Sequence, residues 1–286
     1  MKGIFYMIVA ALCLGTIGVM VKLIGTEVHY MTLNFYRVFL AFIFLICTVP
    51  FFDKSAFNLT RKESAEYFMV GLLLAIALSL YTTANLFAPV QNVVLINYIY
   101  PFFVLIMAYF FLGEKITNTK IATLFIALCG LIIINPFQSG LYTFGNSLAL
   151  FGALFYAILI TEMRKENRDH TIGDVIWFFF FAAVLLSPSP LLFGFGNLGA
   201  VWPYLLILGI IGSGLAYLMF NLALETLEAE VASIIATIIT PITSIILAVV
   251  VIEELLQMRV IIGGILLIIA GVYLETHNRE VKKATN

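Results

Sequence analysis

Charged residues are scarce in this sequence: Asp, Glu, Lys and Arg make up 11% of its 286 residues, whereas 63% are hydrophobic. The mean hydropathy of +1.10 lies far above that of a water-soluble domain. The net charge of −1 shows no excess of either sign, so the composition indicates neither a nucleic acid nor an acidic partner. These shortages argue against a soluble enzyme and predict a polytopic membrane protein.

Cysteine and histidine are equally scarce, with three residues of each. The cysteines stand in apolar segments, at spacings typical of neither a metal site nor a disulfide framework, so we expect small buried side chains. The histidines are scattered among the predicted loops and cannot form one metal site. The six residues are Cys13, Cys47, Cys129, His29, His170 and His277. No metal site is therefore expected.

Long apolar runs fill almost the whole chain. A bilayer core of about 30 Å is crossed by about 20 apolar helical residues, so the chain has room for roughly ten spans. The first run is too long for a signal peptide and lacks a small-residue cleavage site, so we expect it to be retained. The predicted spans are residues 4–24, 30–52, 66–88, 90–112, 119–134, 146–163, one ending at 187, 204–224, 229–252 and 258–274. The predicted fold is an all-α membrane protein with ten transmembrane helices.

Positively charged residues in the predicted connections indicate the orientation of the chain. With the N-terminus in the cytoplasm, 12 of the 15 Lys and Arg residues lie on the cytoplasmic side and only Arg259 lies outside. The other two, Lys22 and Arg37, fall within predicted helices. Because positive charge is enriched in cytoplasmic loops, this bias predicts a multi-pass protein of the cytoplasmic (inner) membrane with both termini in the cytoplasm.

The sequence also contains an internal repeat. Residues 95–115 and 236–255 match at an offset of 140 residues. The aligned pairs are Asn97 with Thr237, Pro101 with Pro241 and Glu114 with Glu254. Two copies indicate a duplication, here into repeats over residues 1–137 and 138–286. Five spans per repeat is an odd number, so we expect the two repeats to be inverted, as in many secondary transporters.

Short motifs on these helices resemble those of a known transporter group. They are, in chain order, Gly15-Thr16, Lys22, Arg37, Pro101, Gly113-Glu114, Pro241 and Glu254. In this order and spacing the chain resembles the drug/metabolite transporter superfamily, in its ten-helix form with paired EamA-type repeats. The resemblance implies export or exchange of small metabolites without ATP hydrolysis and without a bound cofactor. The phosphate-cradling motif GxxxxGK is accordingly absent from the sequence.

Uncharged polar residues on four predicted helices form the candidate substrate site. Pro101 and Pro241 are helix-breaking residues, and each leaves the carbonyl four residues earlier without its usual donor. Residues four apart share one helix face, so the polar side chains form stripes near the middle of the membrane. They are Tyr81, Asn85, Asn97 and Tyr100 in the first half, and Tyr217, Asn221, Thr237 and Thr240 in the second. The alternative is that these groups make interhelical hydrogen bonds that only hold the helices together.

Three charged residues within the predicted helices are further candidates. Arg37 lies about two turns into the second helix, where a guanidinium normally faces a polar interior, so we expect it to attract substrate carboxylates. Its alternative role is to bond helix-end carbonyls. Lys22 and Glu162 are candidates for coupling, but Lys22 lies near a helix end and can snorkel. Glu162 is followed by Arg164, so an ion pair at the membrane surface is its alternative.

The predicted function is a secondary transporter that moves small metabolites, such as amino acids, outward by alternating access. Its partners are then a small-molecule substrate and the lipid bilayer, with no nucleic acid, and a homodimer is one assembly open to it. The alternative within transport is efflux of hydrophobic, drug-like compounds. A remote alternative is an intramembrane enzyme, because Glu253-Glu254 and Arg259 resemble an EExxxR motif. The arginine falls one residue late and no Phe-x-x-x-His follows, so no enzyme is predicted.

Overall fold

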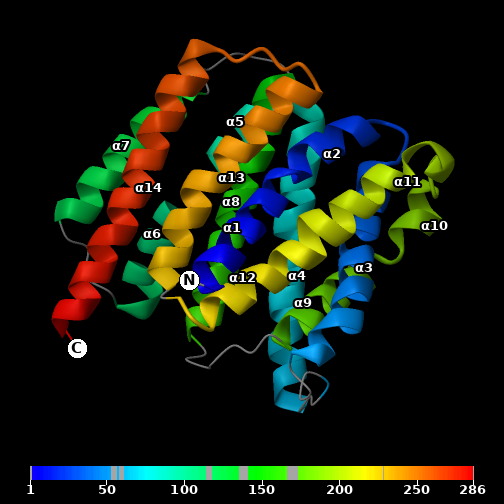
Figure 1. Cartoon of the computed structure of the whole chain (residues 1–286), viewed down its shortest axis with the longest axis horizontal. Helices are drawn as coiled ribbons and strands as arrows, with labels where there is room; N and C mark the ends of the chain where they lie inside the picture. The colour runs from blue at the N-terminus through cyan, green and yellow to red at the C-terminus, as the bar shows by residue number, and fades with distance from the viewer. Residues whose placement is uncertain are drawn as a thin grey trace.

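The protein is a bundle of helices in its computed structural model (Figure 1). The structure describes residues 2–52, 57, 61–113, 118–134, 141–165, 173–227 and 229–285. It is 88% helical, and the described ranges contain no strand. The prediction of an all-α fold is confirmed.

The helices follow one another with short connections. The first half of the chain forms α1 (Lys2–Gly15), α2 (Ile17–Ile24), α3 (Tyr30–Thr48), the 3₁₀ turn η1 (Val49–Phe51), α4 (Arg61–Phe87), α5 (Val90–Asn97), α6 (Tyr100–Leu112) and α7 (Asn118–Ile134). The second half forms α8 (Leu141–Lys165), α9 (Asp174–Leu186), α10 (Ser189–Phe193), α11 (Leu198–Leu206), the π-helix η2 (Ile207–Leu215), α12 (Ala216–Leu224), α13 (Ala229–Val251) and α14 (Met258–Thr285).

Eight segments of the described chain are long and apolar enough to cross a membrane. They are Lys2–Ile24, Tyr30–Phe51, Glu63–Phe87, Val90–Phe111, Tyr142–Met163, Asp174–Phe193, Leu198–Leu224 and Val231–Val251. Two further apolar helices are shorter, Asn118–Ile134 and Met258–Leu274. Large apolar side chains such as Phe110, Phe125 and Ile265 are exposed on the outside, where they suit contact with lipid. The chain is therefore a multi-pass membrane protein.

The two repeat-related prolines shape their helices differently. Pro101 stands in the first turn of α6, directly after a break at Tyr98-Ile99, whereas Pro241 lies inside the continuous helix α13. Proline has no N–H for the carbonyl four residues earlier, and in the first repeat that carbonyl belongs to Asn97, the last residue of α5. The apolar span predicted over residues 90–112 is present as Val90–Phe111, but it consists of two helices and not one.

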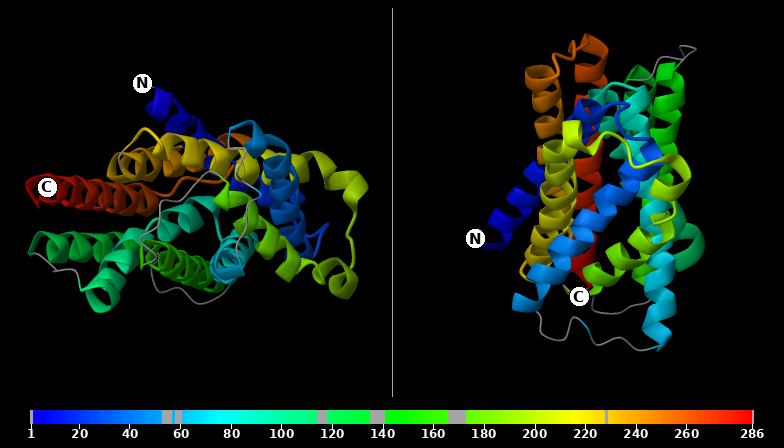
Figure 2. Two further views of the ribbon diagram at one scale, coloured as in Figure 1. Left: turned by 90° about the horizontal axis from the view of Figure 1, so that it is seen from below. Right: turned by 90° about the vertical axis from the view of Figure 1, so that its right-hand side faces the viewer.

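Helices α7 and α14 lie side by side along one edge of the molecule (Figures 1 and 2). Glycines allow this close approach. A Cβ atom on Gly130 would lie 2.9 Å from the carbonyl oxygen of Gly263, and one on Gly263 would lie 2.6 Å from that of Gly130. Small residues at such crossings let helix backbones meet, which gains van der Waals contact in a bilayer. Glycine is thus required here by packing.

Candidate functional site

A small cavity lies between the two halves of the chain, with a volume of about 100 Å³. Five tyrosines and one arginine dominate its polar lining, and we call it the tyrosine cavity. These residues are Arg37, Tyr81, Tyr98, Tyr100, Tyr156 and Tyr217. The rest of the lining includes Asn97, Thr240, Leu14, Ile17 and Phe220. The cavity offers one positive charge inside a wall of aromatic rings.

The break between α5 and α6 is what brings two of these tyrosines to the cavity. Residues two apart on a regular helix point in different directions, but the break lets both Tyr98 and Tyr100 line the same space. The ring of Tyr100 meets that of Tyr156, on α8, edge to face at a centroid distance of 5.0 Å. Such edge-to-face pairs are favourable and fix ring orientation. The aromatic wall therefore depends on contacts between helices of both halves.

Arg37 is the charged group of the tyrosine cavity and is only 1% exposed. Its Nε donates a hydrogen bond to Ser213 Oγ at 2.9 Å, and its Nη1 donates to Thr82 Oγ1 at 2.7 Å. Both acceptors are neutral hydroxyls, and no carboxylate among the described residues forms an ion pair with Arg37. The hydroxyls orient the guanidinium and leave its charge uncompensated, which is costly in a buried position.

Ser213 reaches Arg37 from the π-helix η2. Its hydroxyl also donates to the carbonyl oxygen of Leu208, five residues earlier, at 3.2 Å. Gly209 and Gly214 flank this region, and added Cβ atoms there would lie 2.5 Å and 2.7 Å from side-chain atoms of α3. A widened helical turn of this kind is rare and frequently occurs at functional sites. Here it brings a hydroxyl against the arginine.

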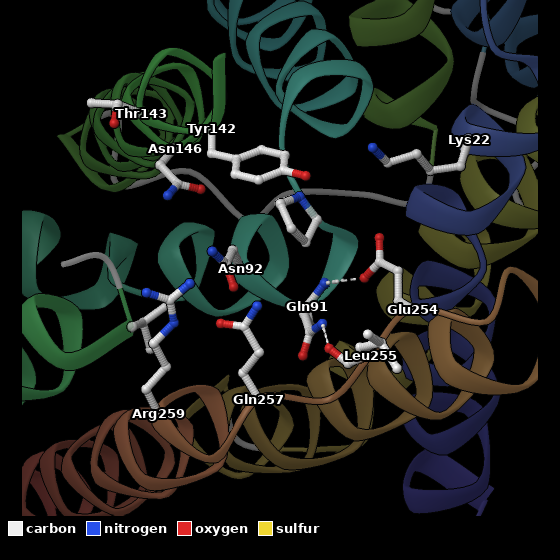
Figure 3. Close-up of a pocket in the computed structure, with 12 residues that line it drawn as sticks. Lys22, Gln91, Asn92, Tyr142, Thr143, Asn146, Glu254, Leu255, Gln257 and Arg259 are labelled. Atoms are coloured by element: carbon white, nitrogen blue, oxygen red, sulfur yellow. Dashed lines mark hydrogen bonds between the residues drawn. The ribbon is translucent and has the colours of Figure 1, made fainter. Parts of the chain in front are cut away.

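A second cavity, of about 310 Å³, lies near the end of α2, the start of α5 and the start of α14 (Figure 3). Nine of its twelve lining residues have polar or charged side chains, and we call it the amide cavity. The charged members are Lys22, Glu254 and Arg259, and the amides are Gln91, Asn92, Asn146 and Gln257. Tyr142 and Thr143 add hydroxyl groups. Its chemistry differs from that of the tyrosine cavity in having many amides and both signs of charge.

Glu254 joins the two halves of the chain beside the amide cavity. Its carboxylate accepts a hydrogen bond from the backbone N–H of Val90 at 2.8 Å, and the N–H of Gln91 lies 3.5 Å from its other oxygen. The side-chain amide of Gln91 donates to the carbonyl oxygen of Leu255 at 2.9 Å (Figure 3). A carboxylate at the first turn of a helix stabilises that helix through its free N–H groups and dipole. Glu254 therefore caps α5 from the opposite half.

Comparison with known proteins identifies the family. The EamA-like transporter family matches residues 1–135 and residues 143–276. The chain belongs to the EamA-like transporter family. A solved crystal structure superimposes with a TM-score of 0.71 over 98% of both chains at 17% sequence identity, which shows a shared fold.

Curated relatives of this EamA-like chain are transporters. It is 31% identical over 115 residues to an S-adenosylmethionine uptake transporter of Rickettsia bellii, covering 40% of this chain and 39% of the relative. It is 26% identical over 157 residues to the pseudopaline exporter CntI of Pseudomonas aeruginosa, covering 54% and 55%. An uncharacterized transporter of Archaeoglobus fulgidus is 23% identical over 272 residues, 93% of each. The relatives named with a substrate are thus matched over about half their length or less.

Six of the nine substrate-binding residues predicted from the sequence lie together around the tyrosine cavity. They are Arg37, Tyr81, Asn97, Tyr100, Tyr217 and Thr240. Pro101 does not line the cavity. It stands in the first turn of α6, directly after the break that separates α5 from α6. Polar residues from both halves of the chain therefore line one cavity, but not all of the predicted ones do.

The other three predicted residues lie outside that cavity. Asn85 and Asn221 donate to the carbonyl oxygens of Tyr81 and Tyr217, at 2.9 Å and 2.8 Å, within their own helices. Thr237 is 2% exposed and faces α14, where a Cβ atom on Gly271 would lie 2.9 Å from the Thr237 methyl group. These three residues therefore line no part of the tyrosine cavity, and their side chains donate no interhelical hydrogen bond to another described residue.

The charged coupling candidates lie apart from the tyrosine cavity. Lys22 lines the amide cavity. Glu162 lies on α8 and lines neither of the two cavities. Glu114, the repeat partner of Glu254, lies outside the described residues.

The sequence-based prediction missed four contributors to the tyrosine cavity. Tyr98 and Tyr156 line it, and Thr82 and Ser213 hold Arg37. A tyrosine far from either end of an apolar span was an available signal for Tyr156, because interface anchors stand near the ends. No sequence pattern pointed to the hydroxyls, which lie 45 and 176 residues from Arg37.

Proposed function

We propose that this chain is a secondary transporter that moves small amino-acid-like metabolites outward by alternating access, with the tyrosine cavity as its substrate site. The carrying observation is Arg37, a buried guanidinium held by two neutral hydroxyls at the edge of a cavity. A substrate carboxylate would supply the missing countercharge. The tyrosine rings would accept the remainder of the molecule.

The size of the cavity supports a small solute over a drug-like one. Its volume of about 100 Å³ is below the roughly 300–1,000 Å³ usual for pockets that hold drug-sized ligands. The relatives' names refer to different compounds and to opposite directions, uptake and export. They support transport of metabolites as a class, and the outward direction remains our proposal.

The proposal includes a transmembrane arrangement. The two shorter apolar helices would join the eight long segments as spans, which makes ten, in inverted repeats over residues 1–137 and 138–286. Substrate sites of inverted-repeat transporters lie where the repeats meet. The lining of the tyrosine cavity comes from both halves and so supports this arrangement. The excess of Lys and Arg in alternate connections supports a location in the inner membrane. It also supports an orientation with both termini in the cytoplasm.

The direct test is transport by the purified full chain in liposomes. Vesicles preloaded with one unlabelled L-amino acid at a time should take up the same labelled amino acid by exchange, for a restricted set of amino acids. Protein-free vesicles and vesicles with the Arg37→Gln variant serve as controls. Movement of a lipophilic cationic dye, with no exchange of any amino acid, would instead support drug efflux. Cleavage of membrane peptides by the same preparation would support the enzyme alternative.

A further inference from the structure

We propose that the amide cavity is a second binding site, which takes a small carboxylate that also carries a hydrogen-bond donor. This site is distinct from the tyrosine cavity. Both cavities touch α5, where Asn97 faces one and Gln91 faces the other. The two residues are six apart, or ~9 Å along the helix. Val93 and Val94 between them are buried, and the two cavities have no lining residue in common.

The charges around the amide cavity leave a positive surplus at one end. Lys22 and Glu254 lie together on one side, whereas Arg259 approaches from the opposite side (Figure 3). The Glu254 carboxylate is already engaged by the first turn of α5. No described residue forms an ion pair with Arg259, and its Nε is enclosed without a hydrogen-bond partner among the described residues. The Arg259 end therefore favours an anion.

Arginine and the amides together indicate the chemical class of the ligand. A guanidinium presents donors that match a carboxylate. Gln91 is 3% exposed and donates to Leu255, but its Oε1 accepts no hydrogen bond from the described residues. Leaving a buried acceptor unsatisfied is costly, so a hydroxyl or ammonium donor on the ligand would be favoured there. A hydroxy- or amino-carboxylate meets both requirements, whereas a hydrophobic cation meets neither.

The test measures binding and therefore stands apart from the transport proposal. L-lactate is titrated into the purified full chain, with binding followed by saturation-transfer NMR on the ligand. The Arg37→Gln background removes the cation of the tyrosine cavity, so that binding observed there reports the amide cavity alone. Propionate, which lacks the hydroxyl, and choline, which is a cation, are the comparison ligands.

In that background we expect lactate to bind and choline to be silent. Arg259→Gln should raise the Kd of lactate at least tenfold, and Lys22→Gln about threefold, because Glu254 already compensates Lys22. Arg259→Lys should restore part of the affinity, since the charge is kept. Propionate should bind several-fold more weakly than lactate. Lys2→Gln, an equal charge loss at an exposed residue near the N-terminus, is the matched control and should leave the Kd unchanged.

Unchanged lactate binding in Arg259→Gln, in a variant with an unaltered melting temperature, would overturn the site. Equal binding of choline and lactate would contradict the proposed class of ligand. Equal binding of propionate and lactate would show that Gln91 accepts no hydrogen bond from the ligand. If no amino acid is transported but lactate binding depends on Arg259, the transport proposal fails and this site stands. If transport depends on Arg37 but Arg259→Gln does not change lactate binding, the amide-cavity site fails and the transport proposal stands.

Discussion

The tyrosine cavity and the amide cavity show two ways of presenting positive charge within one helical bundle. In the first, a single guanidinium is buried, oriented by two hydroxyls and surrounded by aromatic rings. In the second, Lys22 and Arg259 share a larger space with Glu254 and several amides. A buried charge acts strongly because little solvent screens it, whereas partly exposed charges act more weakly and over a wider area. A substrate carboxylate would therefore be held tightly at Arg37 and loosely at Arg259.

The largest expected effect is an all-or-none difference in reporter activity, which tests whether the amide cavity faces the outside of the membrane. The backbone N–H of Asn197 donates to the carbonyl oxygen of Glu27 at 2.9 Å, so the loop after α10 lies at the same end of the bundle as the Lys22 end of α2. A reporter that is active only outside the cytoplasm should work when fused after Gly196 and fail after Lys62. The opposite pattern would place the amide cavity on the cytoplasmic side and reverse the proposed topology.

Removal of the buried charge should have the next largest effect. Arg37→Gln should reduce the rate of exchange roughly 100-fold, in line with the loss of one partner of a buried charge pair. Arg37→Lys keeps the charge but not both donor positions, so it should retain part of the rate. Exchange in liposomes is the measurement, with the amount of folded protein checked by size-exclusion chromatography. Wild-type exchange by the Gln variant would remove Arg37 from the substrate site.

The repeat-related pair Asn97 and Thr237 offers a matched comparison, because only Asn97 lines the tyrosine cavity. Asn97→Ala should raise the apparent KM about fivefold, as expected for one lost hydrogen bond, with little change in melting temperature. Thr237→Ala removes the methyl group that packs against Gly271, so it should lower the melting temperature and leave KM unchanged. Both variants need both measurements. Unchanged KM together with lowered stability in Asn97→Ala would show that Asn97 serves packing.

The smallest expected effect is on the cap that Glu254 provides to α5. Glu254→Gln should lower the unfolding free energy by about 1 kcal/mol, because an ionised acceptor at the helix start is replaced by a neutral one. Glu253→Gln changes a neighbouring exposed carboxylate and should have no measurable effect. The melting temperatures of the unsubstituted protein and of the two variants, measured in the same detergent, give the comparison. Equal destabilisation by both variants would contradict the specific role of Glu254.

The sequence by itself determined the class of this protein. Low charge and long apolar runs are sufficient for a multi-pass membrane fold, because an apolar segment of about 20 residues is stable across a bilayer only as a helix. The ordered motifs were also sufficient to predict the family, which the comparison confirms. Helical periodicity predicted Asn97 and Pro101 on one helix face, but the break at Tyr98-Ile99 puts them on separate helices, and only Asn97 lines the tyrosine cavity.

Only the tertiary structure decided which faces meet. Periodicity relates residues along one helix and says nothing of how that helix is rotated against its neighbours. Asn85 and Asn97 were therefore equal candidates in the sequence, but in the structure only Asn97 reaches the tyrosine cavity. The hydroxyls on Arg37 and the backbone amides on Glu254 come from helices far away in the chain. Such contacts depend on the packing of the whole bundle, which determines the charge balance of each cavity.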